Sequence, residues 1–207
     1  MSTLLAAPLV PPSYATIPLS NSSTVGDNYT HTANGSFRIQ GLNGNDVITV
    51  AAATTGNDFL EGGAGNDTLN AAGTDDILDG GAGNDTLNGN AGNDILRGGA
   101  GADILNGGAG IDTADYSTSS AAVTISLPLD PTRTSRGLGG DANLDTLSGI
   151  ENVVGSAGAD RITGNDLDNQ FVGNAGHDML RSHDRQRRAD RGRHDRRRCE
   201  RRSRRRG

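Results

Sequence analysis

A nine-residue repeat runs through the middle of the chain and restricts it to folds built from stacked short units. The string GGAGND begins at Gly62 and again at Gly80, and close variants begin at Gly89, Gly98 and Gly107. Seven aspartates recur at strict nine-residue steps: Asp58, Asp67, Asp76, Asp85, Asp94, Asp103 and Asp112. Asp46 precedes them at a step of twelve, and Asp160, Asn169 and Asp178 restart the same spacing. A fixed period of this length is typical of a solenoid.

Each unit combines glycines that suit a tight turn with one aliphatic residue that suits a short strand. Glycine usually lies two residues before the acid, and an aliphatic residue such as Leu69 or Leu87 lies two residues after it. Glycine adopts positive φ without steric cost, and an x-Leu-x segment points its leucine inward when extended. One unit buries a single side chain and cannot fold alone, but stacked units form a continuous ladder. Aromatic residues are only 3% of the chain, so a large aromatic core is excluded.

The aspartates point to a hard divalent cation. Stacking brings equivalent carboxylates close together, where like charges repel. Residues 1–181 carry 21 acidic residues and six arginines, so the body cannot neutralise its own charge. The repeats contain no cysteine, and their histidine, His177, takes a variable position, which argues against zinc or copper. Calcium takes six to eight oxygen ligands from carboxylates and carbonyls. The alternative is a glycine–aspartate solenoid whose acids only solvate an edge.

The pattern G-G-x-G-x-D-x-U-x resembles the RTX (hemolysin-type) calcium-binding family over roughly residues 41–181. The resemblance implies an all-β, right-handed parallel β-roll, in two blocks, stabilised by Ca²⁺. Two nonapeptides form one 18-residue coil in that family, and calcium lies between turns on the same side of the roll. Equivalent acids would therefore lie 18 residues apart.

Carried over to this chain, the resemblance assigns the metal ligands. On one side of the roll the ligands would be Asp58, Asp76, Asp94 and Asp112. On the other side they would be Asp67, Asp85 and Asp103, with Asp46 preceding them. In the second block Asp160 would pair with Asp178. Carbonyl groups near Gly63, Gly65, Gly81, Gly83, Gly99 and Gly101 would complete the shells. Thr74 and Ala71–Ala72 depart from the pattern before Asp76, as do Leu167 and Asn169 in the second block.

The chain divides by composition into five segments. These are a leader or cap over 1–40, expected to be poorly ordered; a first RTX block over 41–115; a spacer over 116–154; a second block over 155–181; and an arginine-rich tail over 182–207. The spacer contains AAVTISL, which alternates as a strand does. It resembles the segment found between RTX blocks, which caps one roll and starts the next, and a plain linker is the alternative.

The tail carries 13 arginines and four acidic residues. Three interpretations stay open: a disordered tail, a patch that binds polyanions, or a reading-frame shift. In GC-rich coding, GGC GGC GAC GAC encodes Gly-Gly-Asp-Asp, but read two bases later it begins CGG CGA CGA and encodes arginines. We expect no nucleic-acid partner, because the tail has no aromatic residue for stacking and no pattern beyond charge.

The sequence contains no motif of an enzyme. It has no H-E-x-x-H, no G-x-S-x-G, and no lysine for a P-loop. No apolar run approaches the roughly 20 residues that span a bilayer. The resemblance implies an extracellular protein that the type I secretion machinery exports through a C-terminal signal. Export of this chain is in doubt because an arginine-rich end stands in the place of that signal. The alternatives are a remnant of a secreted enzyme or toxin, and a fragment of an adhesin.

Overall fold

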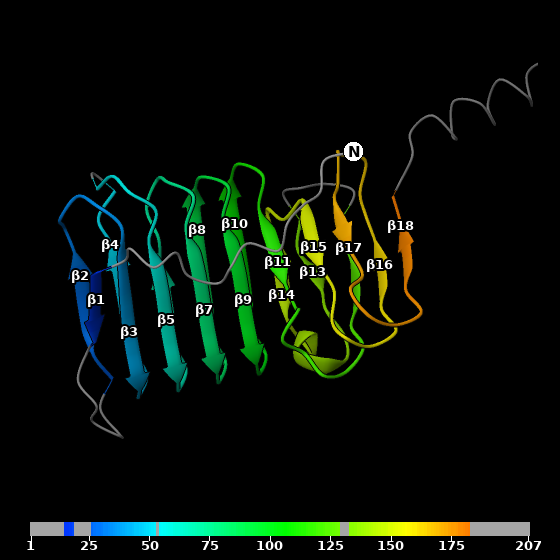
Figure 1. Ribbon diagram of the computed structural model, residues 1–207, viewed down its shortest axis with the longest axis horizontal. Helices are drawn as coiled ribbons and strands as arrows, with labels where there is room; N and C mark the ends of the chain where they lie inside the picture. Colours follow the sequence, from blue (N-terminus) through cyan, green and yellow to red (C-terminus); the bar gives the residue numbers. More distant parts are fainter. Residues whose placement is uncertain (1–14, 19–25, 53, 129–132, 183–207) are drawn as a thin grey trace, which may run out of the picture.

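The computed structural model describes residues 15–18, 26–52, 54–128 and 133–182. Their strands form two large sheets and one small sheet, in which all strand pairs are parallel except β13 with β14. Figure 1 shows β3, β5, β7 and β9 side by side, with β8 and β10 running the opposite way in the sheet behind them. The expected all-β parallel roll is confirmed. The arginine-rich segment 183–207 and residues 1–14 and 19–25 of the leader lie outside the described residues.

From β1 to β11 the strands alternate between the two large sheets along the chain. The first sheet has the order β1 (Ala15–Pro18), β3 (Phe37–Asn43), β5 (Phe59–Ala64), β7 (Ile77–Ala82), β9 (Ile95–Ala100), β11 (Thr113–Asp115), β15 (Asn152–Val154) and β17 (Phe171–Val172). The second has the order β13 (Ser135–Arg136), β14 (Thr146–Ser148), β10 (Ile104–Ala109), β8 (Thr86–Ala91), β6 (Thr68–Asn70), β4 (Val47–Val50) and β2 (Asn28–His31). The third contains β12 (Thr124–Ser126), β16 (Arg161–Thr163) and β18 (Met179–Arg181).

The register steps by 21 residues from β3 to β5 and from β4 to β6, and by 18 residues through the following coils of the first block, so each aliphatic residue lies beside its equivalent in the next coil. In the first sheet Leu60 pairs with Leu78 and Leu78 with Leu96; in the second, Leu69 pairs with Leu87. These inward-facing residues have 0% exposure: Ile39, Leu60, Leu78, Leu96, Ala114 and Val153 in one sheet, and Ile48, Leu69, Leu87, Leu105 and Leu147 in the other. Burying each leucine stabilises the roll by about 1.5–3 kcal/mol.

The spacer contributes strands to both large sheets. β14 pairs with β10, placing Leu147 beside Leu105, and β15 pairs with β11, placing Val153 beside Ala114. The strand expected in AAVTISL is β12, which pairs with β16 in the small sheet. A short 3-10 helix, η1 (Gly140–Ala142), lies between β13 and β14. Residues 146–154 thus add one rung to each large sheet, while the five-part division of the chain stays a prediction.

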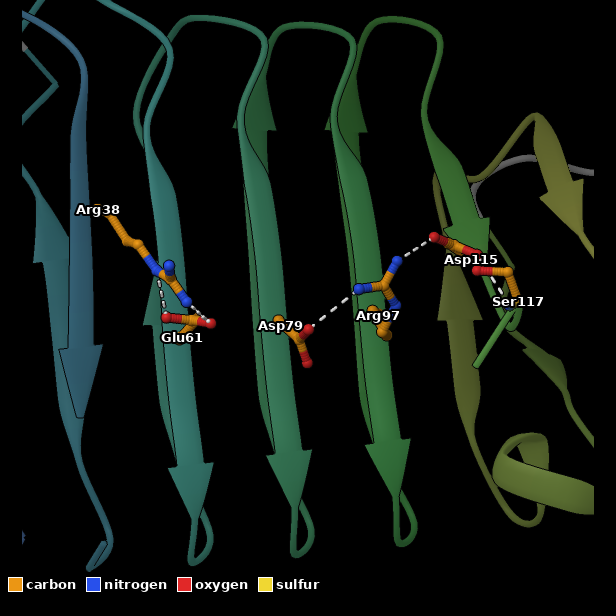
Figure 2. Close-up of polar contacts among 6 residues, drawn as sticks. All are labelled: Arg38, Glu61, Asp79, Arg97, Asp115 and Ser117. Carbon is orange, nitrogen blue, oxygen red and sulfur yellow. Dashed lines mark hydrogen bonds and ion pairs between the residues drawn. The ribbon is translucent and has the colours of Figure 1, made fainter. Parts of the chain in front are cut away.

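The outer face of the first sheet carries a row of charges that sequence analysis did not single out (Figure 2). Arg38 on β3 donates from Nε to Glu61 on β5 at 2.7 Å. Arg97 on β9 lies between Asp79 on β7, at 3.1 Å, and Asp115 on β11. The Arg97 side chain is only 6% exposed, so these pairs are screened less than surface pairs. Each ion pair joins neighbouring coils and favours the observed register.

No helix among the described residues has the length and apolar character needed to cross a membrane.

Candidate metal sites along the aspartate ladders

The repeated aspartates form two buried rows, one beside each large sheet. We call Asp58, Asp76, Asp94 and Asp112 the first ladder, and Asp46, Asp67, Asp85 and Asp103 the second ladder. Each aspartate directly precedes a strand, and its side chain is at most 2% exposed. The residues expected to be neighbours at a spacing of 18 are neighbours in the structure, and Asp160 likewise lies beside Asp178.

One oxygen of each carboxylate binds the backbone of the preceding coil. The N–H of Asp58 donates to Oδ1 of Asp76 at 2.6 Å, and the N–H of Asp76 donates to Oδ1 of Asp94 at 2.8 Å. The second ladder repeats this bond from Asp67 to Asp85 and from Asp85 to Asp103, both at 2.8 Å. These bonds fix the carboxylates in orientation, because a carboxylate oxygen that accepts a buried N–H is costly to release.

The second carboxylate oxygen, Oδ2, has no hydrogen-bond partner at seven of these buried positions. They are Asp46, Asp58, Asp67, Asp85, Asp94, Asp103 and Asp112. A buried polar atom without a partner costs about 1–3 kcal/mol, and more when it is charged. These oxygens occupy the same position in successive repeats, so a positively charged partner would stabilise each of them.

The glycine turns bring backbone carbonyls close to these oxygens. Gly81 and Gly83 have φ of 100° and 143°, which side-chain-bearing residues rarely adopt. A Cβ on Gly83 would lie 1.7 Å from the carbonyl oxygen of Gly65, so equivalent turns stack in close contact. A Cβ on Gly62 would lie 2.3 Å from Oδ2 of Asp67 and 2.6 Å from the carbonyl oxygen of Gly80. The absent side chains thus leave room where carboxylate and carbonyl oxygens converge.

The electrostatics disfavour bare carboxylates at these positions. Burial, opposed by the backbone hydrogen bonds and reinforced by neighbouring carboxylates, raises the pKa of Asp85, Asp94 and Asp103 to about 7. Burial raises the pKa of Asp76 and of Asp112 to about 6, and it shifts the pKa of Asp46, Asp58 and Asp67 upward as well. These upward shifts mean that the charged carboxylate is unfavourable at these positions. A cation bound between carboxylates of neighbouring coils would stabilise the charged form.

The donor set fits calcium. Among the described residues, no group of three or more histidine, cysteine, aspartate or glutamate side chains could hold a metal. A metal between two neighbouring ladder carboxylates would therefore need carbonyl oxygens as further ligands, and the carbonyl oxygen of Gly80 lies near Oδ2 of Asp67. An all-oxygen set with several carbonyls suits Ca²⁺, whereas zinc prefers nitrogen and sulfur ligands.

Two ladder positions lie in the spacer, where sequence analysis did not find them. Asp145 continues the second ladder, because its Oδ1 accepts the N–H of Asp103 at 2.9 Å. Glu151 continues the first ladder, because its Oε2 accepts the N–H of Asp112 at 2.9 Å. Asp145 carries a usable signal, since Asp145-Thr146-Leu147 repeats the acid-x-aliphatic order. It falls outside the nine-residue step, so the period does not predict it.

The irregular units differ in structure from the regular ones. Before Asp76, the turn has no positive φ at residues 71–74, and Thr74 Oγ1 lies 3.1 Å from Oδ1 of Asp76. In the second block, Asn169 takes an acid's place and donates from Nδ2 to the carbonyl oxygen of Glu151 at 2.8 Å. The Oδ2 of Asp160 accepts the N–H of Ser156 at 2.7 Å. Protein groups therefore supply donors at these rungs.

Comparison with known protein families agrees with this geometry. Residues 53–87, 79–114 and 145–180 match the RTX calcium-binding nonapeptide repeat (4 copies). The repeats are RTX calcium-binding nonapeptide repeats. The third match begins at Asp145, the residue that continues the second ladder in the structure. No curated protein matches the chain. The matched segments therefore include most of the two aspartate ladders and Asp160 with Asp178.

Proposed function

We propose that this chain is a calcium-binding RTX module whose folding is coupled to calcium. The unpartnered Oδ2 atoms of the two ladders carry the proposal. They recur at one position of the repeat, they are buried, and the carbonyl oxygens of Gly62, Gly80, Gly98 and Gly107 lie near four of them. The proposed ligands are the ladder aspartates and the carbonyls near Gly63, Gly65, Gly81, Gly83, Gly99 and Gly101. Asp160 with Asp178 is a further candidate pair that differs from the ladders, because Ser156 already donates to both oxygens of Asp160.

The coupling follows from how the roll is stabilised. One leucine or isoleucine per nonapeptide is buried only when the coils stack, and stacking forces the carboxylates together. A bound Ca²⁺ supplies positive charge and a ligand for each free carboxylate oxygen. Metal binding is then part of the folding free energy, because the unfolded chain has no preformed site.

The expected affinity suits an extracellular setting. Calcium modules outside cells bind at roughly 10⁻⁴–10⁻³ M, far above cytosolic calcium. We propose that the chain stays unfolded in a cytosol and folds outside, which is compatible with export by the type I machinery. Its role is structural rather than catalytic, because the repeated acids already serve the ladders.

Circular dichroism of the full chain tests this proposal. Without calcium, in excess chelator, we expect a spectrum dominated by unfolded chain. Addition of millimolar calcium should produce a β spectrum, and magnesium at the same concentration should not. Identical spectra in chelator and in calcium would contradict the coupling, and a calcium titration by dialysis without measurable binding would contradict the function itself.

A further inference from the structure

Asp145 differs from the other carboxylates of the second ladder. It is fully buried, at 0% exposure, and it accepts the N–H of Asp103 through Oδ1 as the repeat demands. Its Oδ2, however, accepts a hydrogen bond from the hydroxyl of Tyr116 at 3.0 Å. The equivalent oxygen of Asp103, one coil earlier, has no partner. Within the second ladder, Oδ2 of Asp145 thus has a protein donor, whereas Oδ2 of Asp103 has none.

Tyr116 is held firmly in the position from which it donates. It directly follows β11, and its N–H donates to the carbonyl oxygen of Val154 at 2.9 Å. Its own carbonyl oxygen accepts the N–H of Ser119 at 3.0 Å. The side chain is 1% exposed and belongs to the hydrophobic core of the roll. A buried tyrosine needs a partner for its hydroxyl, and Asp145 is that partner.

The turn before Asp145 also differs from an RTX turn. Its carbonyls are engaged within the turn: Gly139 accepts the N–H of Ala142 at 3.1 Å, and Gly140 accepts that of Asn143 at 3.3 Å. Ala142 in turn accepts the N–H of Asp145 at 3.3 Å. The 3-10 helix η1 thus directs its carbonyls into local bonds, whereas a calcium shell needs several carbonyls free to converge.

We propose that Tyr116 and the turn at η1 together make Asp145 independent of metal: the hydroxyl satisfies Oδ2, and the engaged carbonyls of the turn leave no shell for a cation even without that hydroxyl. The calcium ladder of the second sheet then ends at Asp103. This inference rests on the proposed function. The hydroxyl of Tyr116 supplies the donor that a cation supplies elsewhere in the ladder. The series of calcium sites in the second sheet therefore ends at the spacer, where protein groups satisfy the last carboxylate. The sheet itself continues, because the spacer still adds β14.

A comparison of two matched aspartate variants in the full chain tests the inference. Asp85→Asn and Asp145→Asn each replace one buried carboxylate of the same ladder by an amide of the same shape. We expect Asp145→Asn to bind as many calcium ions per chain, measured by equilibrium dialysis, as the unsubstituted protein. Asp85→Asn should bind at least one fewer, because its Oδ2 has no protein donor. Loss of a calcium ion in Asp145→Asn would overturn the inference.

Tyr116→Phe provides a second test that keeps the ring in the core. Its thermal midpoint should fall by about 5 °C, because Oδ2 of Asp145 loses its donor. We expect an equal fall at saturating calcium and at a tenfold lower concentration, with an unchanged number of bound ions. A fall that saturating calcium abolishes, with one more ion bound, would contradict the inference. If the unsubstituted chain binds no calcium, the proposed function fails instead.

Discussion

The regular coils of residues 59–109 and the coils of residues 155–181 solve the same packing problem differently. In the regular coils most strands have six residues, and the ladder leucines have 0% exposure. After residue 155 the strands shorten to two or three residues, and Met179 and Leu180 are each 41% exposed. Among the described residues the small sheet ends at β18, so Leu180 has one neighbouring strand there, β16.

The carboxylates of the two regions also differ in their hydrogen-bond partners. In the regular coils Asp85, Asp94 and Asp103 keep an oxygen without a partner. After residue 155, Ser156 donates to Asp160 from both N–H and Oγ, at 2.7 and 2.6 Å, and Asn169 replaces a carboxylate by an amide. The repeat is therefore strict where carboxylate oxygens lack a protein donor, and it varies where protein groups supply one.

The largest effect should come from the buried aliphatic ladder. Leu87→Ala removes a fully buried side chain between two coils and should destabilise the calcium-loaded protein by about 2–5 kcal/mol. Leu180→Ala, at the exposed end of the small sheet, should cost less than about 1 kcal/mol. Denaturant unfolding in saturating calcium measures both variants. Equal losses would mean that the last coil is packed as tightly as the regular ones.

Two glycine-to-alanine variants compare a regular turn, at Gly83, with the irregular turn, at Gly73. Gly83→Ala places a Cβ 1.7 Å from a backbone carbonyl at a φ of 143°, and it should cost about 2–3 kcal/mol. Gly73→Ala meets nothing within 4 Å, so it should be neutral or stabilise by up to about 0.5 kcal/mol. Calcium-saturated thermal unfolding distinguishes them. A neutral Gly83→Ala would show that the turns do not stack as closely as described.

Much of the roll follows from the sequence because its period is local. The nine-residue unit with one aliphatic residue predicts stacked short strands, and the family resemblance adds the 18-residue coil and with it the adjacency of Asp76 with Asp94; the structure has both. The departure at Thr74 is likewise visible in the sequence, and the turn there lacks the positive φ of its neighbours.

The spacer could not be predicted in this way, because its pairing is not local. Asp103 meets Asp145 across 42 residues and Asp112 meets Glu151 across 39, so neither step equals the repeat. Which acid continues a ladder depends on how much chain loops out between β11 and β14. The hydrogen bond from Tyr116 to Asp145 depends on the same loop. A period fixes neighbours only while every coil has the same length.

A smaller effect is expected when one carboxylate is replaced by an amide. Asp94→Asn removes a charge at a rung whose Oδ2 has no donor, so it should raise the calcium concentration for half-folding roughly tenfold. Asp75→Asn removes a charge from an exposed neighbour that keeps its accepting oxygen for Asn93, and it should change this midpoint little. Equal shifts in both variants would attribute the effect to net charge instead of ligation.

The reverse substitution in the drifting region completes the comparison. Asn169→Asp replaces the Nδ2 donor that binds the carbonyl oxygen of Glu151 by a second carboxylate oxygen. The new carboxylate oxygen would then face the carbonyl oxygen of Glu151, at the 2.8 Å of the present hydrogen bond, and the two would repel unless a cation lay between them. Folding of this coil should therefore come to require calcium, as we propose for the regular coils. We expect a rise of about twofold in the calcium midpoint, measured as for Asp94→Asn. An unchanged midpoint would mean that the amide does not substitute for metal at this rung, and that the drift of the repeat after residue 155 has another physical origin.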